Sequence, residues 1–488
     1  MRADLCQLPS QLNLASTIRV QEPQLAAQLG LALYPVMEQA GQQAFALLQQ
    51  RWPTTQRLCV LCGSGNNAGD GYVVARLAKE AGWGVVLLQH DCSLKGDALT
   101  AQQAWLAAGG VILPLTGEWP EAEIFVDALL GTGLQGPLRP AIAAAVAQLN
   151  QRPQPVLALD IPTGLHGDTG CIANVAVSAD VTITFVATKL GLVTGHAAAV
   201  VGEVILAPLQ LGAGLAADGH LLQPPLLQQL PPRGVLSHKG DHGKLLLLGG
   251  GDGMAGAARL AGEAALRSGA GLVAIGCAAS SVDAIVAPRP ELMAAAADSV
   301  LETRLAWASV IAIGPGLGQN RWGQQLWQQA LAAKKPLLVD ADALNLLAQQ
   351  PQRRDNWLLT PHPGEAARLL DCSVADVCAD RLAAATEIQR RYGGVVILKG
   401  AGSLIVTATQ WAVAPVGNSG LATGGSGDVL SGILAGLMAQ GLDLYQAACF
   451  GVLIHGEAAD SAFGVGARGM LPSDLFEHIR YWVNQGTL

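Results

Sequence analysis

Short apolar runs alternate with glycine-rich turns and longer stretches of helical periodicity along most of the chain. A strand, a turn and a helix in repeated order are typical of a parallel sheet covered by helices. The first half opens with a helical stretch at Pro23–Arg51. Its expected strands are Leu58–Cys62, Val85–Leu88, Ile124–Leu130, Val156–Leu159 and Val181–Val186.

The second half follows the same logic. Its expected strands are Lys244–Leu248, Leu272–Cys277, Val310–Ile313, Pro336–Val339 and Val395–Leu398, followed by a hairpin of Leu404–Thr407 and Trp411–Ala414. Two helices, Asp428–Gln440 and Asp443–Ala462, close this half. The halves share an alternating pattern but no motifs, so the pattern does not indicate an internal duplication.

A proline-rich segment separates the halves. Gly212–Gly234 contains four prolines and has no clear hydrophobic period, which is typical of a linker. We therefore predict an α/β protein with two doubly wound domains, at residues 1–215 and 235–488, joined by a linker at 216–234.

The composition narrows the possible partners. The net charge is −8 without a basic tract, which argues against nucleic acid as a partner. No apolar run reaches the roughly 20 residues that cross a membrane, and the first ten residues lack the apolar core of a signal peptide. Nine cysteines are scattered along the chain, so a reducing, cytoplasmic location is expected.

A glycine-rich loop follows the first expected strand. Residues 63–71 read GSGNNAGDG and precede a helical pattern, which places bare amides where an anion can sit. Asp70 would put a carboxylate beside that anion, an unusual choice for plain dinucleotide binding. The alternative is a tight turn in which Asp70 caps the helix.

Two further strand ends carry acids. Asp127 runs into the glycine-rich segment Gly131–Pro137, and Asp160 begins the segment Asp160–Gly164. Because the carboxyl ends of parallel strands face one crevice, these segments are expected to meet. Oxygen-bearing side chains on the three loops suit a hard cation such as K⁺ or Mg²⁺. Alternatively, either acid is a structural cap.

Together these motifs resemble the NAD(P)H-hydrate epimerase family, whose domain is a Rossmann-like three-layer sandwich. The resemblance implies a potassium ion held by Asn67, Asp127 and Thr163. It implies substrate contacts from Asn66, Asn67, Ala68, Gly69, Asp70, Gly131, Thr132, Gly133, Leu134, Gln135, Gly136, Pro137 and Asp160. Ala68 stands where glycine is usual, which predicts a loop less free to adopt positive φ. Thr163 stands where serine is usual and keeps the hydroxyl.

Epimerising a carbinolamine-type carbon requires proton movement or reversible ring opening, which a carboxylate can assist. Since Asp127 is assigned to the ion, we take Asp160 as the catalytic acid–base.

The strongest signal of the second half lies before its first closing helix. Gly424, Gly425 and Gly427 precede a helix expected to start near Asp428. Successive amides at that point would form a site for a terminal phosphate, and Asp428 could take a proton from an attacking hydroxyl. The alternative is that Asp428 is a simple helix cap.

Residues 424–428 resemble the Gly-x-Gly-Asp signature of ribokinase-like kinases. Further motifs are His238–Gly240, Gly249–Ala257, Gly314–Gly318, Asp340–Asp342, Thr360–Glu365 and Lys399–Ser403. As an ordered set they resemble the ADP-dependent NAD(P)H-hydrate dehydratase family, which implies a ribokinase-like α/β domain.

The resemblance implies that the hydrated nicotinamide contacts Ala257, Gly316 or Gly318, His362 and the catalytic Asp428. It implies that ADP, with Mg²⁺, lies along Lys399, Gly400, Ala401, Gly402, Ser403 and Gly427. His362 stands between two prolines at an expected strand end, which favours a site residue over a core residue.

The expected function is the repair of hydrated nicotinamide cofactors, NADHX and NADPHX, by a homo-oligomer. The first domain would interconvert R and S epimers, and the second would dehydrate the S form with ADP. One alternative is a vitamin-precursor kinase with a Rossmann-like regulatory domain, which would leave a stable phosphorylated product. Another alternative is that the first domain has lost catalysis and only binds a ligand or another protein, as the replacement of the usual glycine by Ala68 would indicate.

Overall fold

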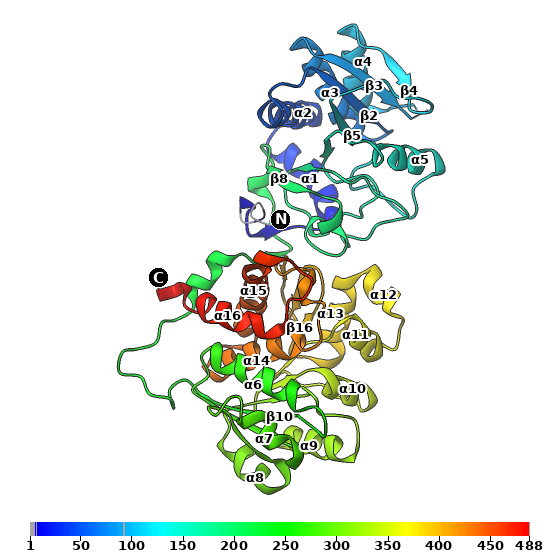
Figure 1. Ribbon diagram of the computed structural model, residues 1–488. Coiled ribbons are helices and arrows are strands. Elements are labelled where there is room, and N and C mark those ends of the chain that lie inside the picture. Colours follow the sequence, from blue (N-terminus) through cyan, green and yellow to red (C-terminus); the bar gives the residue numbers. More distant parts are fainter. Residues whose placement is uncertain (1–4, 6, 91–92, 488) are drawn as a thin grey trace. The chain divides into compact units, whose positions relative to one another are not determined.

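The computed structural model describes residues 5, 7–90 and 93–487, and the chain folds as two compact units, residues 1–220 and 221–488 (Figure 1). The division falls inside the segment 216–234 that the sequence analysis assigns to a linker. That segment carries strand β9 (Gly219–Leu221) and the 3₁₀ helix η5 (Pro224–Gln229), and its Leu227 is fully buried.

A parallel sheet forms the centre of the first unit. Its strands stand in the order β4-β3-β2-β5-β6-β7-β8, and every neighbouring pair is parallel. Their bounds are β2 Arg57–Cys62, β3 Gly84–Gln89, β4 Ile112–Pro114, β5 Ile124–Ala128, β6 Val156–Leu159, β7 Val181–Phe185 and β8 Glu203–Ala207. The doubly wound α/β fold expected for this half is confirmed. A short strand, β1 (Gln11–Leu12), pairs antiparallel with β9.

Helices cover this sheet. They are α1 (Ala15–Gln28), α2 (Leu33–Arg51), α3 (Asn66–Glu80), α4 (Gly96–Ala107) and α5 (Pro140–Leu149), and α3 packs against both α2 and α4. The single helical stretch expected at 23–51 is wrong, because α1 ends before α2 begins. Gly30 follows the last turn of α1 with φ +68°, the left-handed conformation in which glycine commonly ends a helix.

The second unit has a mixed sheet with strands in the order β18-β17-β16-β15-β14-β13-β10-β11-β12. The bounds are β10 Lys244–Leu248, β11 Leu272–Cys277, β12 Met293–Ala296, β13 Val310–Ile313, β14 Leu337–Val339, β15 Trp357–Leu359, β16 Val395–Leu398, β17 Ser403–Val406 and β18 Trp411–Ala414. Pairs from β12 to β16 are parallel, whereas β16, β17 and β18 are antiparallel, so the expected hairpin is present.

The helices of the second unit are α6 Ala255–Arg267, α7 Val282–Val286, α8 Ala297–Trp307, α9 Arg321–Ala332, α10 Ala341–Gln349, α11 Pro363–Leu370, α12 Val374–Ala379, α13 Arg381–Tyr392, α14 Ser426–Ala439, α15 Leu444–Ala462 and α16 Leu475–Trp482. None of the helices described in either unit is both long and apolar enough to cross a bilayer.

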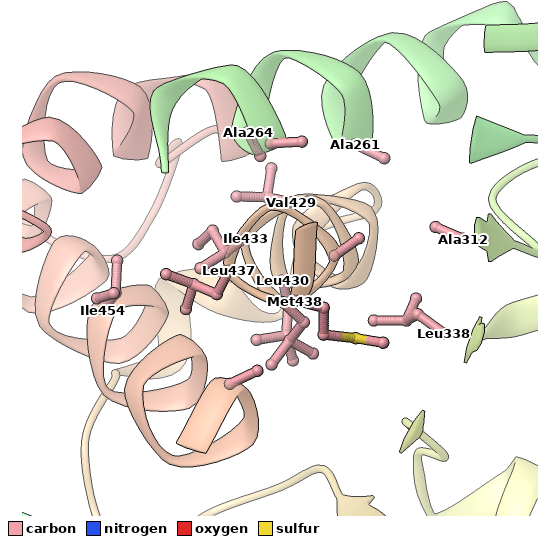
Figure 2. Packing of buried hydrophobic residues seen from close by; sticks show 14 of the residues in the cluster. Ala261, Ala264, Ala312, Leu338, Val429, Leu430, Ile433, Leu437, Met438 and Ile454 are labelled. Carbon is pink, nitrogen blue, oxygen red and sulfur yellow. The ribbon is translucent and has the colours of Figure 1, made fainter. Parts of the chain in front are cut away.

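Helix α14 is the centre of the second core. Figure 2 shows its Val429, Ile433 and Leu437 among side chains of α6, α15 and the sheet. The approach to α6 is very close, since a Cβ on Gly432 would lie 2.0 Å from the carbonyl oxygen of Ala261. This packing fixes the start of α14 against the carboxyl ends of the parallel strands.

Candidate functional site

A cavity of about 480 Å³ opens at the carboxyl ends of the first unit's strands. Its walls come from the start of α3, the loop after β5, the residues after β6 and β7, and the helices α1 and α2. The polar side chains that line it include Glu22, Asn66, Asn67, Asp70, Asp97, Thr132, Asp160 and Lys189. The three loops that the sequence analysis brought together do meet here.

The GSGNNAGDG segment starts α3 rather than forming a long loop. Gly65 is the N-cap residue, so the alternative in which Asp70 caps the helix is wrong. Asn66, Asn67 and Asp70 line the cavity, whereas Ala68 is fully buried and Gly69 packs against Met37. Ala68 lies within the helix and has no positive φ, so the expected loss of backbone freedom does not arise.

Only the first part of the loop after β5 lines the cavity. Gly131, Thr132 and Gly133 line the cavity, whereas the remaining expected contacts, Leu134, Gln135, Gly136 and Pro137, are not among its lining residues. A Cβ on Gly131 would lie 3.3 Å from Cβ of Asn67 and 3.4 Å from Oδ2 of Asp160. Glycine at 131 therefore lets the loop pass close to these two side chains without crowding them.

Asp127 and Thr163 lie fully buried and joined to one another. The Thr163 amide donates to Oδ2 of Asp127 at 2.7 Å, and its hydroxyl is 2.8 Å from Oδ1. The Leu129 amide donates to the same carboxylate at 3.2 Å. Burial raises the pKa of Asp127 to about 6, although these hydrogen bonds oppose the shift.

The amide group of Asn67 is the unpaired member of the expected potassium set. Its side chain is buried, and neither Oδ1 nor Nδ2 finds a hydrogen-bond partner among the described residues. A buried polar group without a partner is costly, so this position fits a ligand that the amide oxygen can bind. Amide, carboxylate and hydroxyl oxygens are the donors that hard cations prefer.

Lys189 is a cavity residue that the sequence analysis missed. Its ammonium group donates to Oδ1 of Asp160 at 2.5 Å, to the hydroxyl of Thr184 at 2.9 Å and to the carbonyl of Phe185 at 2.7 Å. The lysine side chain is 2% exposed. Asp160 itself has φ +65°, a strained conformation for a residue with a side chain, which is often retained at functional sites.

Three more acids line this cavity. Asp70 comes from α3, and Glu22 from α1 and Asp97 from α4 were both missed from the sequence. Burial, reinforced by the charge of Asp160, raises the pKa of Asp70 well above its usual value. Burial likewise raises the pKa of Glu22. The cavity thus combines an ion-paired carboxylate with carboxyl groups that retain protons more readily.

In the second unit, the start of α14 forms the expected glycine-rich helix terminus. Gly425 is the N-cap residue with φ +99°, so the alternative in which Asp428 is the cap is wrong. Asp428 lies in the first turn, and burial raises its pKa to about 6, with a further contribution from Asp340. A Cβ on Gly427 would lie 3.6 Å from Nζ of Lys399, which places this ammonium beside the helix start.

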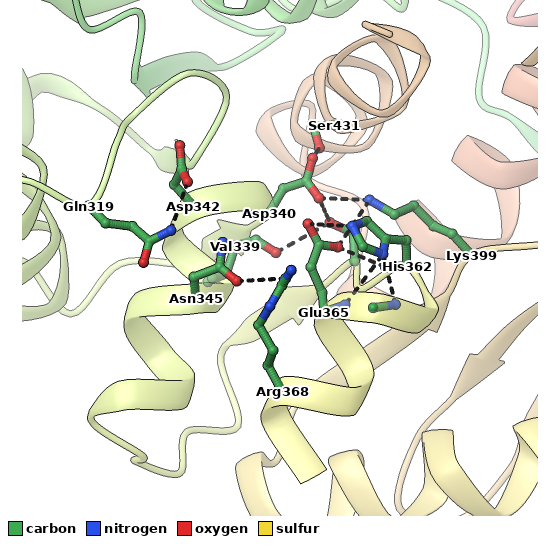
Figure 3. A network of polar contacts seen from close by, with 12 residues as sticks. Gln319, Val339, Asp340, Asp342, Asn345, His362, Glu365, Arg368, Lys399 and Ser431 are labelled. Atoms are coloured by element: carbon green, nitrogen blue, oxygen red, sulfur yellow. Dashed lines mark hydrogen bonds and ion pairs between the residues drawn. The ribbon is translucent and has the colours of Figure 1, made fainter. Parts of the chain in front are cut away.

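A buried network supports that ammonium (Figure 3). Asp340, at the end of β14, accepts hydrogen bonds from Lys399 at 2.9 Å, Thr360 at 2.7 Å and Ser431 at 2.7 Å. The network joins the ends of three strands to α14. Asp340 keeps a lowered pKa, because Lys399 and these hydrogen bonds outweigh the effect of its burial. The Asp340–Asp342 motif is part of the resemblance to the dehydratase family, but nothing in the sequence indicates this role for Asp340.

His362 has a structural role besides the one expected. It is the N-cap residue of α11, and its Nδ1 accepts from the amides of Gly364 at 2.9 Å and Glu365 at 3.3 Å. Its other ring nitrogen lies 3.4 Å from Glu365, and about half of the side chain is exposed. Burial and the charge of Lys399 lower the pKa of His362, which favours a neutral ring. Its proton then lies on Nε2, because Nδ1 accepts from the two amides.

The remaining expected residues fall into two groups. Gly316 and Ala257 are neighbours, since a Cβ on Gly316 would lie 3.3 Å from that of Ala257, and the amide of Gly318 donates to Asp342 at 2.8 Å. The loop Gly400–Ser403 is held by Arg381, a buried residue that the sequence analysis missed. Its guanidinium donates to the carbonyls of Ala401 at 2.6 Å and Gly402 at 3.0 Å.

Comparison with known proteins covers both units. A family model described as NAD(P)H-hydrate dehydratase matches residues 245–481, and one described as YjeF-related protein N-terminus matches residues 33–191. The chain is 46% identical to the bifunctional NAD(P)H-hydrate repair enzyme Nnr of Escherichia coli (strain K12), over 99% of this chain and 96% of that protein. The Coxiella burnetii protein of the same name is also 46% identical, over 94% and 97%.

Among solved structures, the second unit resembles the ADP/ATP-dependent NAD(P)H-hydrate dehydratase of Bacillus subtilis, crystallised with ATP and Mg²⁺. The identity is 33% and the TM-score 0.50, over 54% of this chain and 97% of that one. The near-complete match to the bacterial repair enzymes places both units in a single known family. The chain belongs to the bifunctional NAD(P)H-hydrate repair enzymes.

Proposed function

We propose that the first unit interconverts the R and S epimers of hydrated NADH and NADPH, and that the second unit dehydrates the S epimer at the expense of ADP. The observation that carries the proposal is the pair of sites at the sheet ends. In the first unit, Asp160 forms an ion pair with Lys189. In the second unit, Asp428 lies in the first turn of a helix with a glycine-rich start, and Lys399 lies beside that start. Family membership of the whole chain supports the same assignment.

The second site suits phosphoryl transfer to a hydroxyl group. Asp428 takes the proton of the hydroxyl on the hydrated ring, and the oxygen attacks the terminal phosphate of ADP. The bond from that phosphorus to the bridging oxygen breaks, and AMP leaves. The amides at the start of α14 and the ammonium of Lys399 stabilise the charge on that phosphate. The ring nitrogen then expels phosphate, a better leaving group than hydroxide, and loss of the neighbouring ring proton restores the dihydropyridine.

The nucleotide contacts are proposed for Lys399–Ser403 and Gly427, and the ring contacts for Ala257, Gly316 or Gly318, His362 and Asp428. Arg381 supports this proposal, because its guanidinium donates to two carbonyls of this loop and so fixes the course of the loop. Mg²⁺ would accompany the nucleotide, since the Bacillus subtilis dehydratase was crystallised with ATP and this ion together. When bound, the ion would neutralise phosphate charge.

We also propose that Asn67, Asp127 and Thr163 bind potassium in the first unit. Two observations support this assignment. The buried amide of Asn67 has no partner among the described residues, and Asp127 and Thr163 hold a carboxylate and a hydroxyl oxygen 2.8 Å apart. The ion would brace the loops after β2, β5 and β6, on which Asn66, Gly131–Gly133 and Asp160 stand.

The decisive experiment mixes the purified protein with both hydrate epimers and compares ADP, ATP and no nucleotide. We expect recovery of NADH absorbance and release of free phosphate from both epimers when nucleotide is present. A stable phosphorylated product without recovered NADH would instead favour a vitamin-precursor kinase. Conversion that stops when the S epimer is consumed would mean that the first unit only binds its ligand.

A further inference from the structure

The carboxylate of Asp160 is held by a cation that is almost completely inaccessible to solvent. The ammonium group of Lys189 donates hydrogen bonds to Asp160, Thr184 and Phe185. These bonds fix the direction in which Oδ1 of Asp160 points. The other oxygen, Oδ2, lies on the side of Gly131, where a Cβ would meet it at 3.4 Å. One carboxylate oxygen is thus bound to the protein, and the other faces the cavity loop.

Other charged groups line the same cavity from separate elements. Glu22 and Arg19 come from α1, Asp70 from α3 and Asp97 from α4. Arg19 is exposed, whereas Lys189 is the buried cation of the cavity lining. Among the described residues, Asp70 forms no ion pair, and its burial favours the protonated form. Asp160 and Asp70 therefore share one cavity in different electrostatic surroundings, as acid–base pairs do.

We infer that Lys189 is a positioning residue that keeps Asp160 ready to accept the substrate hydroxyl proton, and that Asp70 is the acid that completes the exchange. The inference rests on the proposed epimerase function and deepens it. Lys189 acts only through Asp160, whereas Asp160 and Asp70 contact the substrate.

The step balances without any further reactant. Asp160 accepts the hydroxyl proton, and the freed electron pair forms the carbonyl bond as the bond between that carbon and the ring nitrogen breaks. The electron pair of the broken bond stays on nitrogen, which takes the proton of Asp70. The open chain is an aldehyde, and rotation presents its other face. Ring closure then returns each proton to its donor.

The first test replaces Lys189 with methionine, which keeps the length of the side chain but removes its charge. We expect Lys189→Met to lower the epimerase kcat about 100-fold, the lower end of what acid–base catalysis contributes, with KM changed by less than about threefold. Lys79→Met, on the exposed last turn of α3, is the matched control and should leave kcat unchanged. Circular dichroism and thermal melting of the same samples report whether the first unit, which is compact by itself, is folded.

Chemical rescue separates charge from packing. Lys189→Ala should regain at least tenfold in kcat when ethylammonium is added, because the free cation can occupy the space beside Asp160. Tetramethylammonium, which cannot donate a hydrogen bond, should give no rescue. A Lys189→Met enzyme with kcat within threefold of the natural enzyme would overturn the inference, and so would equal rescue by both cations.

The role of Asp70 has its own measurement. Asp70→Asn should lower kcat at least 100-fold, because a carboxamide is far too weak an acid to transfer a proton to the ring nitrogen. In water enriched in ¹⁸O, the natural enzyme should retain the substrate oxygen during each epimerisation. Incorporation of solvent oxygen in step with epimerisation would mean loss and return of water, and would overturn the ring-opening step. If the natural enzyme does not exchange the epimers at all, the proposed function itself fails.

Discussion

At the scale of single residues, some site residues could be predicted from the sequence and others could not. Asp127, Asp160 and Asp428 follow apolar runs or glycines, and so they could be identified as candidates. Lys189 and Arg381 could not, because a single lysine or arginine outside a motif carries no local sign of its distant partners. Lys189 meets Asp160 from 29 positions away, and Arg381 meets Ala401 from 20. Such partnerships are made by the fold rather than by a motif.

At the residue scale, dehydration should depend on the ionised form of Asp428. Burial raises the pKa of this carboxyl to about 6, so below that pH it is protonated and cannot accept the substrate proton. We expect kcat of the dehydratase to fall about tenfold for each pH unit below about 6. Asp428→Asn should lower kcat at least about 100-fold and abolish this dependence, while ADP still binds in calorimetry. A variant that keeps activity within tenfold would contradict the assignment of the base.

Potassium binding gives a second prediction at this scale. A ligand that binds only the folded state raises stability, by about 2.7 kcal/mol at one hundred times its Kd. We therefore expect KCl, but not choline chloride, to raise the Tm of the first unit. Asn67→Ala should remove this shift, because it deletes the amide that has no partner among the described residues. Asn66→Ala is the control, since that side chain is exposed, and it should retain the shift.

Among the elements, long apolar strands were predicted best. The parallel strands β6, β10, β11 and β13 have the predicted bounds, because a buried parallel strand is apolar on both faces. The strands β16 and β18, on either side of β17, have them too. The three-residue strand β4 was not predicted, since so short a run gives no period. The equally short β15 was expected only as a strand that ends before His362, without bounds. The helical pattern at 23–51 also hid the break between α1 and α2. There a glycine in the left-handed conformation, rather than a change in hydrophobicity, ends the helix.

The packing of α14 on α6 leads to a prediction at this scale. A methyl group at Gly432 would overlap the Ala261 carbonyl at 2.0 Å, so Gly432→Ala must separate the two helices. We expect a loss of about 1–3 kcal/mol in the free energy of unfolding of the second unit, measured by denaturant titration. Gly256→Ala lies on α6, where a Cβ would meet nothing within 4 Å, and should be neutral or slightly stabilising. Equal effects of the two changes would contradict this account of the packing.

For the whole molecule, the sequence motifs identified both activities because each set lies in order within one half of the chain. The structure adds that these halves are separate compact units. The Bacillus subtilis dehydratase, which corresponds to the second unit over 97% of its own length, indicates that such a unit can exist without the first. Potassium, the homo-oligomer and the cytoplasmic location stay predictions.

Separate sites imply that two variants, each lacking one of the two activities, can complement each other. Asp160→Asn should repair the S epimer rapidly and the R epimer only at the uncatalysed rate of epimerisation. Asp428→Asn should interconvert the epimers without forming NADH. A mixture of the two variants should convert both epimers completely, with a rate that rises with the concentration of each. Failure of the mixture, with both single activities intact, would show that the hydrate must pass within one chain.

The parallel arrangement of the first sheet has one more consequence. The site residues all lie at or beyond the carboxyl ends of their strands; they are Asn67, Asp127, Asp160 and Lys189. The loops that lead into the amino ends of the strands therefore carry none of these residues. The turn between α5 and β6, at residues 150–155, is one of them. Its exposed Gln151 offers an attachment point for a fluorescent dye or an affinity handle, remote from the nicotinamide chemistry.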